Sequence, residues 1–188
     1  GVPLPRDPEL VLPVWTPGSY LVREFSRNLR DLRVVTPSGT PLPVRKVAKN
    51  RWRIEREAGE SPFTVSYHVF GHDLSCHDVD VTPEHLYGNG AALFCAVEGT
   101  QALPLELTVE APAGWKVTCE LEEVGRDPWR FRARDYDELV DSPIDAGTGA
   151  ELTFQVEGVA HRALLCGEGG NYAPDRLKED LSRIVSAT

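Results

Sequence analysis

Methionine is absent from the 188-residue sequence, and lysine is scarce, since 16 of the 20 basic residues are arginine. Because the chain begins at Gly1 and contains no methionine, we expect it to be a piece of a longer protein, with Gly1 left over from cloning. The excess of arginine over lysine is typical of genomes rich in G and C, which favours a bacterial source. Function must therefore be sought in a parent protein as well as in the chain.

Long hydrophobic runs are also missing. No stretch approaches the roughly 20 apolar residues of a membrane helix, and no basic segment with an apolar run opens the chain. We therefore expect a soluble protein with no membrane partner, cytoplasmic rather than exported. The four cysteines include no C-x-x-C pair, which favours small buried side chains over a zinc cage and leaves their redox state open. They are Cys76, Cys95, Cys119 and Cys166.

Motifs for covalent or phosphate chemistry are lacking as well. There is no G-x-S-x-G nucleophile elbow and no glycine-rich loop between a strand and a helix. Ser19 follows Gly18 in a run that superficially resembles an elbow, but the preceding Pro17-Gly18 pair equally forms a plain turn. The acidic stretch 136–141 is more typical of helix capping than of acid–base catalysis. The sequence thus predicts no catalytic residue.

Histidines are few, and three of the five lie close together. His68, His72 and His77 are interspersed with Cys76 and with aspartates at 73, 78 and 80. His72 and His77 are five positions apart, which places them on different faces of a helix or a strand, and no common zinc site has this spacing. The pattern favours a polar loop between strands at 63–70 and 91–97, with no metal ligand.

Acidic residues outnumber basic ones, giving a net charge of -9, but the charge is uneven. Residues 1–60 hold 11 basic and 7 acidic groups, and residues 61–188 hold 9 and 22. An arginine stripe runs through the first part at Arg23, Arg27, Arg30 and Arg33. Acidic residues interrupt the stripe, no recognition motif accompanies it, and the rest of the surface would repel a polyanion. We therefore expect no nucleic-acid partner.

What the sequence does contain is alternation of apolar and polar residues, the period of strands with one buried face. The stretches are Trp52–Ile54, Phe63–Val69, Leu105–Val109, Trp115–Leu121, Trp129–Ala133 and Leu152–Val156. Proline and glycine mark turns at 37–39, 58–60, 112–114 and 147–149. Short strands at this spacing predict a mainly β fold, an antiparallel β-sandwich-like domain.

Two helical segments complete the prediction. Residues 135–141 break the alternation before Ser142-Pro143 and fit one short helical turn. After Pro174, apolar residues at 177, 181, 184 and 185 predict an amphipathic C-terminal helix. Glycines at 167, 169 and 170 form a connector ahead of it. We expect an N-terminal β domain at 1–170, with the helix at 171–188 leading into a truncated next domain; the alternative is a helix packed back on the sheets.

The run Pro13-Val14-Trp15-Thr16-Pro17-Gly18-Ser19-Tyr20, followed by Arg23 and Phe25, resembles the opening of the N-terminal domain of the glycyl aminopeptidase family. Further similar segments follow in the family's order and span nearly the whole chain. They are 49–52, 67–75, 88–94, 112–117 and 136–144. The resemblance implies a β domain followed by a thermolysin-like catalytic domain with an HExxH zinc motif, and often a PDZ domain.

No histidine of this chain is followed by glutamate, so the resemblance transfers no catalytic or zinc-binding residue. It implies no cofactor in this chain and zinc in the parent's missing catalytic domain. It also implies that the domain packs on that catalytic domain and walls the substrate cleft, with peptide substrate at its edge.

Tyr87 and Asn89 have the composition of a cleft rim, although Asn89-Gly90 equally forms a plain turn with Tyr87 packed over it. The signature residues are interpreted as structural. They are Trp15, Pro17, Gly18, Ser19, Tyr20, Tyr136, Asp137 and Pro143.

Two functions are consistent with these patterns. The first is a supporting domain of a zinc aminopeptidase whose substrates carry a small N-terminal residue, glycine or alanine, a preference implied by the resemblance alone. The second is a free-standing β-sandwich that binds carbohydrate or protein through tryptophans. These would be Trp15, Trp52, Trp115 and Trp129. Alternation places the last three inside the fold, which weakens the second hypothesis.

Overall fold

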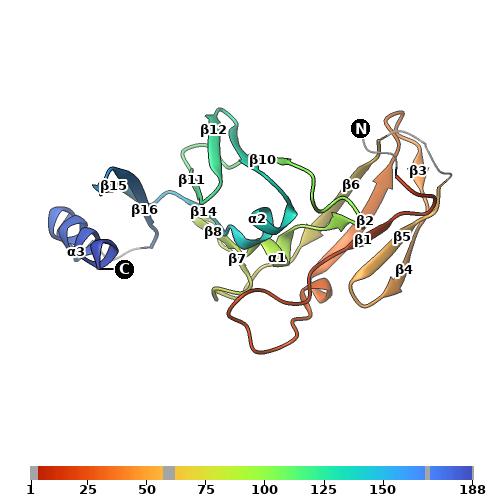
Figure 1. Cartoon of the computed structure of the whole chain (residues 1–188), viewed down its shortest axis with the longest axis horizontal. Coiled ribbons are helices and arrows are strands. Elements are labelled where there is room, and N and C mark those ends of the chain that lie inside the picture. The colour runs from red at the N-terminus through yellow and green to blue at the C-terminus, as the bar shows by residue number, and fades with distance from the viewer. Residues whose placement is uncertain (1–3, 57–61, 168–169, 188) are drawn as a thin grey trace.

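The computed structural model describes residues 4–56, 62–167 and 170–187. They form a mainly β protein whose antiparallel sheets follow one another along a long axis, with three helices and a 3-10 turn (Figure 1). The predicted fold class is confirmed. The turn predicted at 58–60 lies outside the described residues, whereas those at Gly39 and Gly114 are present with positive φ, the conformation that favours glycine.

Two sheets enclose the first core, at the right of Figure 1. One has the order β4-β5-β1-β9: Val44–Ala48, Arg51–Ile54, Glu9–Val11 and Ala96–Val97. The other has the order β3-β2-β6: Pro41–Leu42, Leu29–Val35 and Thr64–Val69. Inward-facing residues of both sheets fill the space between them, with Phe25 of the 3-10 turn η1 (Phe25–Arg27). The most deeply buried are Leu10, Leu12, Val34 and Ile54.

Two further sheets and a helix enclose a second core. The sheets have the orders β11-β14-β8-β7 and β10-β13-β12. Their strands are Lys116–Cys119, Ile144–Gly147, His85–Gly88 and Val79–Val81, then Leu105–Val109, Trp129–Ala133 and Glu122–Arg126. Phe131, which is fully buried, packs with Val117 and Ile144 at the centre. The apolar residues of this mainly β, sandwich-like fold are thus divided between two cores.

Helix α2 (Tyr136–Asp141) confirms the short helical turn predicted at 135–141. Asp135 caps its first turn, because its carboxylate accepts a hydrogen bond from the Glu138 backbone N–H at 2.9 Å. Tyr136 is buried in the second core, and its hydroxyl donates to the Phe94 carbonyl at 2.6 Å. The acidic residues here therefore serve helix formation.

The strand predicted at 91–97 is wrong. Gly90–Leu93 forms the short helix α1, and only Ala96–Val97 remains extended as β9. The Asn89 side chain accepts a hydrogen bond from the Ala91 N–H at 3.0 Å, which starts the helix. Gly90 lies against α2 so closely that a Cβ there would be 2.7 Å from the Leu139 carbonyl oxygen. Capping and this close approach between helices override the apolar pattern.

The last elements form a separate group at the left end of Figure 1. Strands β15 (Ala150–Val156) and β16 (Val159–Leu165) pair as a hairpin, and helix α3 (Pro174–Ser186) lies against β15. The predicted C-terminal helix is confirmed, and none of its residues is buried. The domain division at residue 170 stays a prediction. Among the described residues, no helix combines the length and the apolar character needed to cross a bilayer.

Candidate functional site

The segment 13–25, here called the signature loop, is a long loop that follows β1 and ends at the first residue of η1 (red to orange in Figure 1). A tight turn closes its tip, since the Ser19 N–H donates to the Thr16 carbonyl at 3.1 Å and Gly18 has a φ of 79°. The Trp15 indole N–H donates to the Ser19 carbonyl at 2.7 Å. These bonds hold the tip of the loop in one shape.

Ser19 is the centre of a second set of bonds within the signature loop. Its hydroxyl accepts from Arg23 Nε at 2.9 Å and donates to the Leu21 carbonyl at 3.1 Å. The Arg23 backbone N–H in turn donates to the Val14 carbonyl at 2.6 Å, which joins the two arms of the loop. Ser19 therefore fastens the loop, and its hydroxyl contacts a cation rather than the basic imidazole that a nucleophilic serine needs.

The internal bonding of the signature loop turns several apolar side chains outward. Tyr20 is 100% exposed, Val22 is 77% exposed and Leu21 is 66% exposed, whereas Thr16 and Ser19 are buried. Three consecutive apolar side chains on a well-fastened loop form a ready contact surface for another part of a protein. Trp15 adds to this surface, being 53% exposed.

Tyr87 and Asn89, predicted for a substrate rim, meet at one backbone carbonyl. The Tyr87 hydroxyl and the Asn89 side-chain NH₂ both donate to the Cys76 carbonyl, at 3.2 and 3.0 Å. Asn89 is buried, and its side-chain oxygen caps α1. Burial, and after it nearby Cys76, raises the pKa of Tyr87. The structure gives both residues a structural task, and their role at a rim stays a prediction.

The remaining signature residues lie near α2 and in the loop tip. Asp137 is exposed in the first turn of α2, a position where an acidic side chain complements the helix dipole. Pro143 follows α2 and borders the cleft described below. Pro17 is exposed at the turn of the signature loop. A structural role for these signature residues stays a prediction.

Each of the three clustered histidines contacts a different side chain. His68 lies 3.4 Å from Asp31 of β2, and His72 lies 3.9 Å from Asp80 of β7. The His77 ring lies against its neighbour Cys76, with Nδ1 at 3.2 Å from the sulfur. Within the described residues, the three imidazoles do not converge as one set of ligands.

One group of ligand-type side chains does converge within the described ranges, and sequence reasoning missed it. His85, Asp145 and Cys166 place one nitrogen, oxygen or sulfur atom each within 4.8 Å of the others. His85 is on β8, Asp145 is on β14 and Cys166 follows β16. Nothing in the local sequence indicates this group, because strand pairing across 60 residues brings the first two together.

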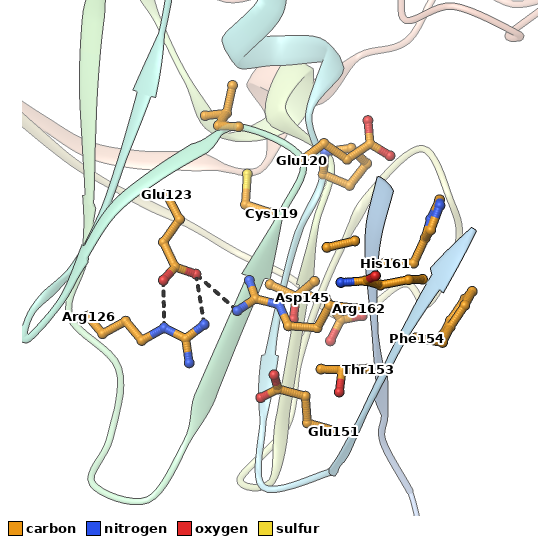
Figure 2. Close-up of a pocket in the computed structure, with 15 residues that line it drawn as sticks. Cys119, Glu120, Glu123, Arg126, Asp145, Glu151, Thr153, Phe154, His161 and Arg162 are labelled. Carbon is orange, nitrogen blue, oxygen red and sulfur yellow. Dashed lines mark hydrogen bonds and ion pairs between the residues drawn. The ribbon is translucent and has the colours of Figure 1, made fainter. Parts of the chain in front are cut away.

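A cleft of about 960 Å³ opens between β11, β14 and the β15–β16 hairpin (Figure 2). Glu123 lies between two guanidinium groups, with Arg126 at 2.5 Å and Arg162 at 3.0 Å. The hydrogen bond from Arg126 is the main reason why the pKa of Glu123 is lowered. This carboxylate is a fixed anion and not a proton donor at neutral pH.

The cleft also lacks an activated nucleophile among its described lining residues. Burial raises the pKa of the Cys119 thiol, which therefore stays protonated at neutral pH. His161 stacks on Phe154 with a ring separation of 5.2 Å. The cleft can thus accommodate chain or ligand, but its residues do not form a catalytic set.

Comparison with known proteins identifies a family and shows a likeness to a solved structure. The family model for the peptidase M61 N-terminal domain matches residues 3–148. The crystal structure of an aminopeptidase N family protein from Idiomarina loihiensis is similar, with a TM-score of 0.87 and 36% sequence identity. That match covers 96% of this chain and 31% of the other, so the chain spans less than a third of its solved relative. A search among curated proteins found no match.

The family match contains both the signature loop and α2, the segments that carried the resemblance stated from the sequence. It ends at residue 148, just before β15 begins at Ala150. The resemblance is confirmed by this match, which extends over far more than half of the residues. The chain belongs to the peptidase M61 N-terminal domain family.

Proposed function

We propose that this chain is the non-catalytic N-terminal domain of a zinc-dependent aminopeptidase and that the signature loop seats it against the catalytic part. The family match and the aminopeptidase relative support a role in a peptidase. The relative is more than three times as long as the region matched, which leaves room for a separate catalytic part. The parent would act on peptides with a small N-terminal residue such as glycine or alanine.

The docking role is supported by one observation on the signature loop: internal hydrogen bonds fix its backbone, yet several of its apolar side chains are exposed. Backbone and side-chain hydrogen bonds fix the loop, yet Tyr20, Leu21 and Val22 make their exposed apolar surface available. A loop that is already ordered loses little conformational entropy when it binds. Aromatic and aliphatic side chains of this kind are typical anchors of buried interfaces.

The structure does not favour a free-standing module that binds through tryptophans. Trp52 is buried, and Trp115 and Trp129 pack partly buried against the second core. Arg126 and Arg162 also cover the ring of Trp129 at 5.1 and 5.8 Å. Trp15 is the exposed one of the four, and it belongs to the signature loop.

The proposal is tested in the parent protein. We expect the parent to release glycine or alanine from a chromogenic peptide, to lose this activity to a chelator, and to regain it with zinc. The isolated 188-residue chain should show no turnover with added zinc. Turnover by the isolated chain, or an active parent that is indifferent to chelation, would contradict the proposal.

Variants of the signature loop test the docking role separately. Replacing Tyr20, Leu21 and Val22 by alanine in the parent should lower kcat/KM by up to about 100-fold, because small displacements of a site wall misplace substrate. Leu74→Ala with Val159→Ala is a matched control, since both side chains are exposed apolar groups outside the loop. Equal activities of the two variants would rule out the loop as the contact. The melting temperature of each variant chain checks that folding is unchanged.

A further inference from the structure

His85, Asp145 and Cys166 meet at the junction between the family domain and the hairpin that follows it. His85 Nε2 lies 3.1 Å from Asp145 Oδ1, and the Cys166 sulfur lies 3.6 Å from the same oxygen. The side chains of His85 and Asp145 are 18% and 34% exposed, so the pair is only partly shielded from solvent. Solvent, and therefore a hydrated ion, can reach the group.

Strand register explains how the first two side chains come together. In the β8–β14 ladder His85 pairs with Gly147 and Tyr87 pairs with Asp145. Residues two apart on one strand point to the same face, so His85 and Asp145 are diagonal neighbours on one face of the sheet. Their convergence is therefore fixed by the backbone of two paired strands.

Gly147 makes room for the third side chain. A Cβ at this position would lie 3.3 Å from the Cys166 sulfur and 2.8 Å from the Glu84 carbonyl oxygen. Cys166 directly follows β16, whose partner β15 begins three residues after Gly147. The absent side chain thus lets the end of the hairpin approach the sheet closely enough to bring its thiol to His85 and Asp145.

The three donors match the preference of one class of ion. Zinc in proteins is bound by imidazole nitrogen, carboxylate oxygen and thiolate sulfur. With bonds of about 2.0 to 2.3 Å, tetrahedral ligand atoms lie about 3.4 Å apart. The separations of 3.1 and 3.6 Å bracket that value, and all three atoms lie within 4.8 Å of one another.

We propose that His85, Asp145 and Cys166 bind one zinc-type divalent cation, with water as the fourth ligand. On binding, the Cys166 S–H bond breaks, the proton leaves to solvent and a sulfur–metal bond forms, with no change of oxidation state. The ion joins residues of the family domain, which ends at 148, to the end of the next hairpin. Its role is to hold the end of the hairpin against the family domain.

The test uses the whole 188-residue chain, freed of metal with a chelator and titrated with Zn²⁺ against a chromophoric competitor, and separately with Co²⁺. We expect one strong site and a thiolate-to-cobalt charge-transfer band. Cys166→Ser should remove the band and weaken Zn²⁺ binding by about 100-fold or more, since loss of an outer-shell partner alone costs about 10- to 100-fold. His85→Gln is a second variant should the first fail to fold.

Cys76→Ser is the matched control, because Cys76 is also exposed and also contacts a histidine, at 3.2 Å from His77. It should leave Zn²⁺ affinity and the cobalt band unchanged. Zn²⁺ should also raise the melting temperature of the wild type and of the control but not of Cys166→Ser. The proposal is overturned if the wild type binds no Zn²⁺, if Cys166→Ser and His85→Gln bind as the wild type does, or if the control loses the site.

Discussion

Tyr67 shows how a single side chain secures a connection in this fold. Its hydroxyl donates to the Leu93 carbonyl at 2.7 Å and accepts from the Cys95 N–H at 3.1 Å. It thereby holds the segment between α1 and β9 against β6. Burial is the main reason why the pKa of Tyr67 is raised, and it also raises the pKa of Cys95 from 9.0 to about 11.

These shifts predict a loss of stability at alkaline pH. Above pH 9 the unfolded chain releases the protons of Cys95 and then of Tyr67, while the folded chain keeps them. The folded state then binds more protons, so the free energy of unfolding falls as pH rises. Below pH 9 this contribution is fully present. We expect urea unfolding to require less denaturant at about pH 10.5 than at about pH 8.

Tyr67→Phe removes the hydroxyl alone, and urea unfolding again measures its contribution to stability. It should lower the free energy of unfolding by about 1 to 3 kcal/mol at neutral pH, because the Leu93 carbonyl and the Cys95 N–H lose a partner. It should also make the alkaline decline shallower. Tyr172→Phe, at an exposed tyrosine, is the control and should change neither. A wild type whose stability is flat up to about pH 10.5 would contradict this account.

At the residue scale, the sequence predicted the signature residues and missed the His85 group. Trp15, Gly18 and Ser19 form a local motif, so their proximity in the chain is already their proximity in space. His85 and Asp145 are 60 positions apart and meet only through the β8–β14 register. A single sequence carries no signal for that pairing, because either strand could pair with several others.

Among the elements, α1 depends most on one capping residue. Asn89 accepts from the Ala91 N–H and donates to the Cys76 carbonyl, so its side chain joins the helix to the polar loop before β7. A helix of four residues has too few internal hydrogen bonds to form on its own. Its geometry is set by this cap and by its packing.

Asn89→Ala is therefore expected to destabilise the chain by about 1 to 3 kcal/mol, through loss of the cap and an unpaired Cys76 carbonyl. Denaturant unfolding measures the change. Asn171→Ala, at an exposed asparagine outside the helices and strands, should leave stability within about 0.5 kcal/mol of the wild type. If both variants are equally stable, Asn89 is free to serve another group, as the rim prediction requires.

Element by element, period-two alternation located strands well where one face meets a core, as at Trp129–Ala133 and Leu152–Val156. The strand predicted at 91–97 did not rest on alternation, and it is wrong because residues 90–93 form a helix that is largely buried. A short apolar run cannot by itself distinguish a buried strand from a buried helix. Alternation also missed short strands such as β7 and β14, whose pairing depends on distant partners.

On the scale of the whole molecule, the two cores are joined where α1 meets α2. Leu93 and Val140 pack against both cores, and Gly90 lies between the two helices. A Cβ at Gly90 would be 2.7 Å from the Leu139 carbonyl oxygen and from the Val140 Cα, atoms of the backbone that cannot rotate away. A substitution that disturbs the packing at this junction is therefore expected to affect both cores.

Gly90→Ala should lower the free energy of unfolding by about 1 to 3 kcal/mol, the usual cost of overpacking. Hydrogen exchange should show lost protection in β5 of the first core and in β13 of the second. Gly125→Ala is the control, because the atoms nearest to its Cβ would belong to the end of the long, flexible Arg130 side chain and not to the backbone. Loss of protection confined to one core would show that the cores are independent.

The order of strands in the first sheet has a consequence for biosynthesis. Leu10 of β1 pairs with Trp52 of β5 and, on its other side, with Val97 of β9. The ribosome adds about 5 to 20 residues per second, so β1 waits roughly 4 to 17 s for its last partner. During that interval one edge of β1 is open to other chains, and factors that shield nascent polypeptides would protect the strand at that edge.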